Sequence, residues 1–208
     1  MIQDVKPKNW AVVNNAKGLH EIHESDINVA ILKRDIKVFN REISLLVSET
    51  TKIELHGSVE VLISKLKNKL KEYKLISKDI ISLLLNFKEI TRATSFKLLL
   101  TTVDTNMCRK FHIDNITLRL LCTYFGPGTL WLPEDSINRK ALNGVSNNNA
   151  IVINENNTQQ VKTGDVLLLK GQKYCATSNA VMHKSPIIEG HGVKRLLLRI
   201  DTNDFLNF

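Results

Sequence analysis

Apolar residues follow two different spacings along this chain. In the first 94 residues they recur mostly every three or four positions, which is the spacing of amphipathic helices. This spacing predicts helices over residues 35–47, 58–73 and 77–90, and a short apolar run predicts a strand over residues 27–32. Ser77 is the expected N-cap of the third helix, because its hydroxyl can accept a hydrogen bond from a free N–H group of the first turn.

From residue 95 onward, the apolar residues form runs of strand length. The runs at residues 95–103, 116–124, 161–171 and 193–201 are rich in apolar and β-branched side chains. Gly, Pro and Asn, which favour turns, separate them. Many short strands joined by turns are typical of a sandwich or jelly roll, and they argue against a sheet built from alternating strands and helices.

We therefore predict an α+β fold with two regions. Residues 95–208 are expected to form a double-stranded β-helix, or jelly roll, and residues 1–94 a mainly helical support region that packs against its outer sheet. The chain has 208 residues, of which 43% are hydrophobic, so it can bury one sizeable core. A single domain over residues 1–208 is the expectation.

Three residues of the strand-rich half suggest a metal site. His112 and Asp114 are two positions apart, so on a strand both side chains point to the same face. With His183 further along the chain, they would supply two imidazoles and one carboxylate. That set leaves three coordination positions open, as in the non-haem Fe(II) oxygenases. A core histidine satisfied by a neighbouring aspartate is the alternative for His112.

Side-chain alternation places further residues relative to this pair. If a strand continues without interruption from His112 to Tyr124, these two side chains share a face. By the same alternation, Arg195, Leu197 and Arg199 share one face of the last apolar run. Tyr124 is then predicted to point inward, toward the metal ligands.

Four motifs follow one another in an order that resembles a known enzyme family. They are His-x-Asp at residues 112–114, a Gly-x-Gly-Thr segment at 126–133, Gly-Asp before an apolar run at 164–169, and His-x-Ser-Pro at 183–186. This order is distantly similar to the 2-oxoglutarate/Fe(II) oxygenases, particularly the prolyl-4-hydroxylase-like branch. More closely, residues 95–201 resemble a largely bacterial family known only as domain of unknown function family 1826.

The oxygenase resemblance implies a metal and a reaction. His112, Asp114 and His183 would hold Fe(II), and 2-oxoglutarate would bind as the co-substrate. The enzyme would be a dioxygenase that hydroxylates a C–H bond of an unknown substrate. The protein would contribute the ligands, the orientation of the substrate and the exclusion of water.

The same resemblance implies a site for the co-substrate. A basic residue that follows the distal histidine would hold the distal carboxylate of 2-oxoglutarate. Arg195 fits this position, with Lys194 and Arg199 as alternatives, and arginine is favoured because its planar fork binds a carboxylate through two hydrogen bonds. Tyr124 would donate a further hydrogen bond to the co-substrate, and a tyrosine packed in the core is the alternative.

The cysteines leave a second class of function open. Cys108 lies four residues before His112, and thiolates together with imidazoles suit zinc. Cys108, His112, His183 and either Asp114 or Cys175 could close a tetrahedral site. The protein would then bind zinc without redox activity, on a cupin-like fold, in metal homeostasis, storage or sensing. A metal-free binding module is a third possibility.

The charge of the chain favours anionic partners. The formal net charge is +8 and the sequence pI is about 9.4. Lys67, Lys71, Lys74 and Lys78 recur at helical spacing, which would give a basic stripe. Aromatic residues make up only 6% of the chain, and Tyr73 alone lies among these lysines. A solvated helix face is therefore favoured over a nucleic-acid surface, and an anionic substrate stays among the expected partners.

The expected compartment is the cytoplasm. The first ten residues lack the apolar core of a signal peptide, and no apolar run reaches the length that would span a membrane. Three cysteines give no paired framework, which fits a reducing compartment.

One segment has a biased composition. Residues 143–160 are rich in Asn and predict a flexible loop around a short strand at residues 150–153. This loop is interpreted either as a lid over the site or as an inert insertion.

Overall fold

A computed structural model gives the fold and describes residues 9–143, 148–174 and 179–203. Four α-helices are present in this part of the chain: α1 (Asn40–Ser48), α2 (Val59–Lys69), α3 (Lys74–Thr91) and α4 (Asn148–Ile151). The strands are β1 (Trp10–Val13), β2 (Val29–Leu32), β3 (Lys52–Gly57), β4 (Phe96–Val103), β5 (Leu118–Phe125), β6 (Leu130–Trp131), β7 (Gln159–Gln160), β8 (Val166–Lys170), β9 (His183–Lys184) and β10 (Arg195–Thr202). Short 3₁₀ helices lie at Ala16–His23, Lys37–Phe39, Glu134–Ser136, Arg139–Asn143 and Glu155–Asn157.

The strands form two sheets that face each other. The large sheet has the order β1-β2-β8-β5-β10-β4-β3, and the small sheet has the order β7-β6-β9. A bridge between His112 and His183 adds the segment before β5 to the edge of the small sheet. From β4 to β10, the chain thus passes back and forth between the two sheets, and Trp131 of the small sheet packs in one cluster with Leu121 and Leu197 of the large sheet. This is a jelly roll, so the predicted fold class is confirmed.

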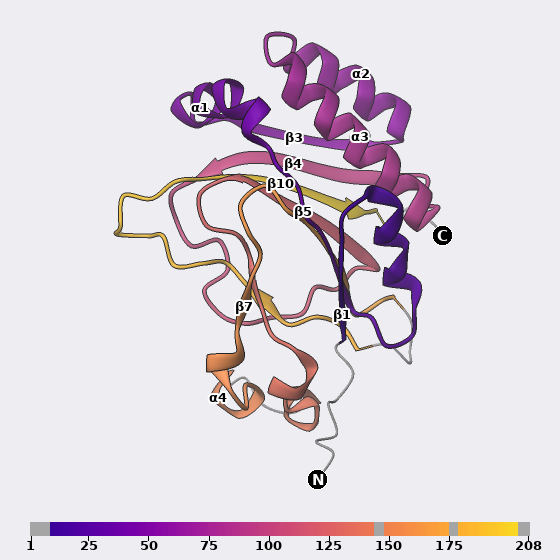
Figure 1. Cartoon of the computed structure of the whole chain (residues 1–208), viewed down its shortest axis with the longest axis vertical. Coiled ribbons are helices and arrows are strands. Elements are labelled where there is room, and N and C mark those ends of the chain that lie inside the picture. The colour runs from indigo at the N-terminus through magenta and orange to yellow at the C-terminus, as the bar shows by residue number, and fades with distance from the viewer. Residues whose placement is uncertain (1–8, 144–147, 175–178, 204–208) are drawn as a thin grey trace.

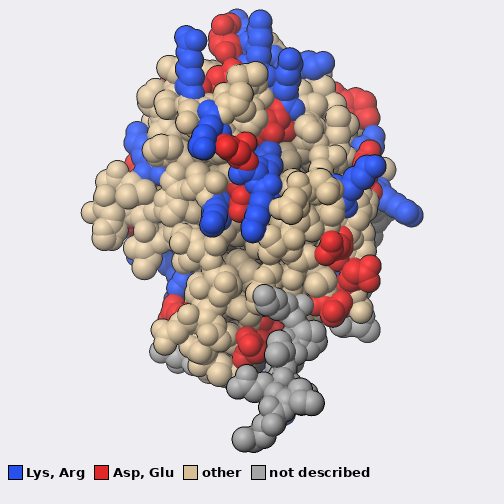
Figure 2. Space-filling view, viewed as in Figure 1, with Lys and Arg blue, Asp and Glu red and all other residues tan. Residues whose placement is uncertain are grey.

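Helices α1, α2 and α3 cover the other face of the large sheet (Figure 1). Side chains of β10 alternate between the two faces of the large sheet. On the helix side, the core contains Leu196, Leu198 and Ile200. Arg195 and Leu197 point toward the small sheet, as the predicted alternation requires. Lys and Arg side chains are prominent on the outer surface above α2 and α3 (Figure 2).

The helix boundaries follow capping contacts, one of which the sequence did not reveal. Ser58 caps α2, where its hydroxyl accepts a hydrogen bond from the N–H of Val61 at 3.5 Å. The prediction that Ser77 caps the next helix is wrong, because α3 begins at Lys74 and Ser77 is buried within it. The carboxylate of Glu42 in α1 accepts hydrogen bonds from the N–H groups of the first turn of α3, at 3.2 and 2.8 Å. A cap supplied from 30 or more residues away leaves no local signal in the sequence.

The N-terminal region also contributes strands to the large sheet. The strand expected at residues 27–32 is present as β2, and it pairs with β1 in parallel and with β8 in antiparallel fashion. At the opposite edge, β3 pairs with β4. Its side chains alternate, with Ile53 and Leu55 buried and Lys52, Glu54 and His56 exposed. None of the described helices combines the length and the apolar character that crossing a bilayer requires.

The Asn-rich segment differs from its predicted structure. The short strand expected at residues 150–153 is replaced by the single turn α4, followed by a bridge between Val152 and Ile137. The N–H of Asn138 donates to the carbonyl of Ile151 at 2.7 Å, which anchors this turn. Residues 144–147 lie outside the described part of the chain, so the role of 143–160 as a lid stays a prediction.

Candidate metal centre

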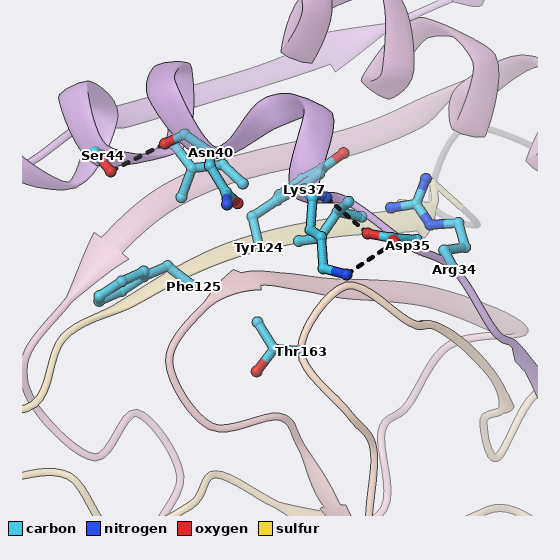
Figure 3. A pocket seen from close by; sticks show the side chains of 10 residues that line it. Arg34, Asp35, Lys37, Asn40, Ser44, Tyr124, Phe125 and Thr163 are labelled. Atoms are coloured by element: carbon cyan, nitrogen blue, oxygen red, sulfur yellow. Dashed lines mark hydrogen bonds and ion pairs between the residues drawn. The ribbon is translucent and has the colours of Figure 1, made fainter.

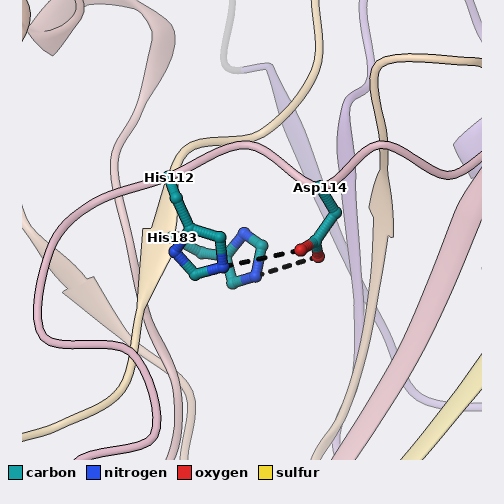
Figure 4. Close-up of side chains that lie close together, drawn as sticks. All are labelled: His112, Asp114 and His183. Carbon is teal, nitrogen blue, oxygen red and sulfur yellow. Dashed lines mark ion pairs between the residues drawn. The ribbon is translucent and has the colours of Figure 1, made fainter. Parts of the chain in front are cut away.

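His112, Asp114 and His183 lie together, with one nitrogen or oxygen donor atom from each within 4.8 Å of the others (Figure 4). Nε2 of His183 is 3.1 Å from Oδ2 of Asp114, and Nε2 of His112 is 3.5 Å from Oδ1 of the same carboxylate. An ion bound at about 2.1 Å from each donor, with the donors at right angles, needs donors about 3 Å apart. The two distances to Asp114 are close to this spacing, and the donors of the two histidines lie within 4.8 Å of each other, so small side-chain rotations would bring all three onto one ion.

Backbone pairing brings the two histidines together. The N–H of His112 donates to the carbonyl of His183 at 3.0 Å, and the N–H of His183 donates to the carbonyl of His112 at 3.0 Å. Residues that exchange both hydrogen bonds in an antiparallel pair stand directly opposite each other. As a result, two residues 71 positions apart place their rings with centroids 4.4 Å apart.

The ring orientation directs the same nitrogen of each histidine toward Asp114. Nδ1 of His112 lies 3.2 Å from the carbonyl oxygen of Lys110, and Nδ1 of His183 lies 3.3 Å from that of Val181. If each Nδ1–H donates to its carbonyl, each Nε2 presents a lone pair to the carboxylate. Two acceptors then face each other, and either a proton on a ring or a metal cation relieves that repulsion. This is the arrangement of a metal-binding histidine whose other nitrogen is held by the protein.

A partly buried arginine, Arg119, fixes the carboxylate, and the sequence motifs did not predict this role. Nη1 of Arg119 in β5 donates to Oδ2 of Asp114. Nε and Nη2 of the same guanidinium donate to the two carboxylate oxygens of Asp201, at 2.6 and 2.9 Å. Unbroken alternation from His112 to Tyr124 predicts that Arg119 lies on the face away from His112, and the structure shows that this prediction is wrong. The strand begins only at Leu118, so the alternation within β5 is not set by His112.

The electrostatics of the site keep the carboxylate ionised. Burial alone would raise the pKa of Asp114, but hydrogen bonds with His112 and His183 and the charge of Arg119 outweigh it and hold the pKa well below its usual value. The hydrogen bond to Asp114 raises the pKa of His112 above its usual value, against the opposing effect of burial. The site is therefore built to hold positive charge, as either a proton or a metal ion.

His112 and His183 line a cavity that also contains Arg195. The cavity holds about 380 Å³ of empty space, open solvent included. Arg195 is only 1% exposed, and its Nη2 donates to the hydroxyls of Thr123 and Thr129 at 3.1 and 3.4 Å. Its Nε has no hydrogen-bond partner among the described residues. Burial lowers the pKa of the guanidinium to about 10, because no acidic partner offsets the loss of water.

Tyr124 lies on the opposite face of the large sheet, which corrects the predicted orientation. Its ring belongs to the core under the helices, and its hydroxyl donates to Oδ2 of Asp79 at 2.5 Å. It lines a separate cavity on the helix side, near Arg34 and Lys37 (Figure 3). The reason is that residues 113–117 do not continue the strand, so the alternation that begins at Leu118 is independent of His112.

The remaining candidates are distributed around the cavity. Arg199 lines it, and its Nε is 3.3 Å from Oδ2 of Asp201. Lys194, the alternative anchor for a co-substrate, is half-buried just before β10. Cys108 lines the cavity but is not one of the donors that lie within 4.8 Å of one another. Cys175, the other proposed zinc ligand, lies outside the described residues.

Solved structures similar to this chain include two bacterial proteins. One is a prolyl-4-hydroxylase from Pseudomonas putida, with 10% identity over 92% of this chain and 97% of that chain, and a TM-score of 0.48. The other is a bsmA homologue from Methylobium petroleophilum, with 10% identity over 91% of this chain and 92% of that chain, and a TM-score of 0.49.

A sequence profile identifies the family directly. No protein of curated function matches the chain. The profile described as "Protein of unknown function (DUF1826)" matches residues 14–201, which extends the predicted resemblance at 95–201 into the helical region. The match covers both the helices and the jelly roll with its histidine-aspartate cluster. The chain belongs to the DUF1826 family.

Proposed function

We propose that this protein is an Fe(II)- and 2-oxoglutarate-dependent oxygenase that acts on an unknown substrate. One observation supports the proposal most strongly: a cavity lined by two members of the histidine-aspartate cluster also contains a buried arginine that has no acidic partner among the described residues. A buried, unpaired guanidinium is costly, and a carboxylate ligand would offset that cost. The oxygenase reaction needs both features in one place.

The ligand set suits Fe(II). Nε2 of His112, Nε2 of His183 and a carboxylate oxygen of Asp114 would hold the ion, and three coordination positions would stay open. When bound, the metal and 2-oxoglutarate would supply the oxidising chemistry. The protein would hold the ligands in place and restrict the entry of water.

Arg195 would bind the distal carboxylate of 2-oxoglutarate. Its side chain starts from β10, in the middle of the large sheet, where the strand is paired on both sides. The hydroxyls of Thr123 and Thr129 hold one end of the guanidinium, while Nε is left without a partner. The planar fork of arginine matches a carboxylate better than the ammonium group of lysine.

Arg119 would act as a positioning residue. It binds Oδ2 of Asp114, so that Oδ1 is left to face His112. Asp201 holds the guanidinium through two hydrogen bonds, which prevents Arg119 from turning toward the solvent. Partners of this kind orient the residues that bind the metal, and their loss weakens metal affinity by about 10–100-fold in known sites.

Calorimetric titration under anaerobic conditions tests the proposal. Protein loaded with Fe(II) should bind 2-oxoglutarate, and Arg195→Ala should weaken that binding about 100-fold while the metal stays bound. Arg195→Lys should weaken it less, because the charge remains. Arg199→Ala is the matched control on the same strand and face. Formation of succinate from 2-oxoglutarate in the presence of O₂ is the second measurement.

Three results would contradict parts of this proposal. If the wild-type protein with Fe(II) does not bind 2-oxoglutarate, the oxygenase assignment is wrong. If Arg199→Ala abolishes binding and Arg195→Ala does not, the anchor is Arg199. If Cys108→Ser loses most of its metal affinity, the cysteine is a ligand, and the zinc-binding alternative with four protein ligands is favoured.

A further inference from the structure

Six lysines crowd the junction between α2 and α3, on the side of the large sheet away from the metal centre. Residues 65–78 contain six lysines and one acidic residue, Glu72. All six lysines are exposed, and none forms an ion pair with another described residue. Lysine and arginine side chains project above these helices (Figure 2).

Two of these lysines lie where positive charge is unfavourable. Lys74 and Lys78 occupy the first two turns of α3, and its first turn contains no acidic residue. The N-terminal end of a helix carries a partial positive charge, so a lysine there lowers the stability of the helix. Four like charges close together add to this effect. The carboxylate of Glu42 already caps the N–H groups of this turn, so the repulsion among the lysine ammonium groups is what a bound anion would relieve.

The lysines surround a groove whose floor is apolar. Lys67, Lys71, Lys74 and Lys78 line it together with Leu70 and Ile81, and it holds about 560 Å³ of empty space, open solvent included. The aliphatic parts of the lysine side chains extend the apolar surface, while their ammonium groups stay in water. The groove therefore offers apolar contact in its centre and positive charge at its rim.

We propose that this groove binds an acidic segment of a partner protein that also carries apolar side chains. The charge at the rim requires an anionic occupant, and the apolar floor requires one with apolar groups to bury. An amphipathic acidic helix satisfies both conditions, as in other complexes where a helix lies in a groove. A nucleic acid satisfies only the first, and no aromatic side chain lines the groove for a base to stack on.

Fluorescence anisotropy with labelled probes tests the groove on the metal-free protein, so the result does not depend on the oxygenase proposal. The probe is a synthetic helix with Glu on one face and Leu on the other. Polyglutamate of equal charge tests the need for apolar groups, and a single-stranded oligonucleotide of equal charge tests the nucleic-acid alternative. The amphipathic peptide should bind most tightly, and its affinity should fall as salt is raised.

A matched pair of charge-swap variants locates the binding. The groove variant carries Lys67→Glu, Lys71→Glu, Lys74→Glu and Lys78→Glu, and its affinity for the peptide should fall about tenfold or more. The control variant carries the same change of charge at four exposed lysines elsewhere, namely Lys17, Lys33, Lys52 and Lys162. Circular dichroism checks that both variants fold.

Each outcome decides the proposal. Loss of binding in the groove variant and not in the control supports it. Equal losses in both variants would show a general effect of net charge and overturn it. Tighter binding of the oligonucleotide than of the peptide would replace the protein partner with a nucleic acid, and no binding of the peptide at low salt would leave the groove without this role.

Discussion

Two arginines on opposite faces of the large sheet, one partly and one fully buried, differ in the groups that their guanidinium hydrogen atoms bind. On the helix side, Arg34 pairs with Asp79 at 2.7 Å, donates to the carbonyl of Gly164 at 3.0 Å and contacts the sulfur of Cys122 at 3.2 Å. On the cavity side, the hydrogen-bond partners of Arg195 within the described part of the chain are two threonine hydroxyls. The side chain of Arg34 is 14% exposed and Arg195 is 1% exposed, so both guanidinium groups are largely removed from water.

The difference lies in what surrounds each charge. Burial lowers the pKa of both guanidinium groups, but around Arg34 the neighbouring Cys122, Tyr124 and Asp79 outweigh it and raise the pKa. Around Arg195 nothing opposes burial, and the pKa falls to about 10. A paired buried charge is part of the folded structure, whereas an unpaired one indicates that a ligand completes the site. The comparison therefore separates a structural arginine from one prepared for an anion.

Removing the paired arginine should have the largest effect. Arg34→Ala leaves the largely enclosed carboxylate of Asp79 with the Tyr124 hydroxyl as its partner among the described residues, so the free energy of unfolding should fall by about 3–5 kcal/mol. Urea unfolding measures this change. In a double-mutant cycle, Asp79→Asn combined with Arg34→Ala should cost less than the sum of the two single changes. Additive losses would mean that the pair is not a unit.

Arg119→Ala should have a somewhat smaller effect on the metal-free protein. Asp201 keeps Arg199 at 3.3 Å, and Asp114 keeps both histidines, so neither acid is left alone. We expect a loss of about 3 kcal/mol, the lower end of what breaking a buried ion pair costs. Arg119→Lys should lose less stability, because the positive charge remains. A loss as large in Arg119→Lys as in Arg119→Ala would show that the shape and packing of the arginine matter more than its charge.

Acid should remove the contribution of Asp114 to the stability of the folded protein. Its pKa in the folded protein lies well below the value of about 3.9 that an unfolded aspartate has. The resulting stabilisation is therefore fully present above pH 3.9 and is lost as the pH falls from there toward the lower pKa of the folded state. Unfolding measured between pH 6 and pH 2.5 should show this loss, and Asp114→Asn should show less of it. A variant with an unchanged acid profile would assign the loss to other carboxylates.

Replacing the unpaired arginine should leave the metal-free protein as stable as before, or more so. Arg195→Met removes a buried charge without an acidic partner and keeps an apolar side chain of similar length. We expect the free energy of unfolding to rise by about 1 kcal/mol. Addition of 2-oxoglutarate should raise the melting temperature of the Fe(II)-loaded wild type and not that of the variant. A large loss of stability would make Arg195 a structural residue like Arg34.

Charge changes at exposed lysines should alter the free energy of unfolding least, because water screens these charges. Lys74→Glu replaces a positive charge with a negative one at the first residue of α3, and the free energy of unfolding should rise by about 0.3–1 kcal/mol. Thermal unfolding at low salt measures it, and high salt should reduce the gain. Lys52→Glu, outside any helix, is the control. An equal gain there would attribute the effect to net charge.

Local patterns predicted much of the fold. The helices at residues 35–47 and 58–73 and the strand-rich second half follow from spacing alone, because side chains on a helix face and on a strand recur at fixed periods. The alternation of Arg195, Leu197 and Arg199 held because β10 is an unbroken strand. Short structured turns such as α4 were harder to predict from the sequence, because a single turn depends on contacts rather than on periodicity.

The order of motifs along the chain predicted the three metal ligands. It did not predict the side chains that follow the break in the strand before β5. The grouping of His112, Asp114 and His183 followed from the order of motifs, and the structure brings them together. Tyr124 and Arg119 were assigned to the wrong faces, because residues 113–117 interrupt the strand and reset the alternation. No periodicity in a sequence reveals such an interruption. The family match was also wider than predicted, since it begins at residue 14.

The alternation along β3 also bears on how copies of this protein meet one another in a crowded solution. Within the described residues, β3 pairs with β4 alone, which leaves its other backbone edge open to any strand that approaches. Lys52, Glu54 and His56 stand along this edge, so an incoming strand would have to strip water from charged side chains. Natural sheets use such residues to prevent edge-to-edge aggregation. Replacing them with valine should therefore increase the tendency of the protein to form fibrous or amorphous aggregates.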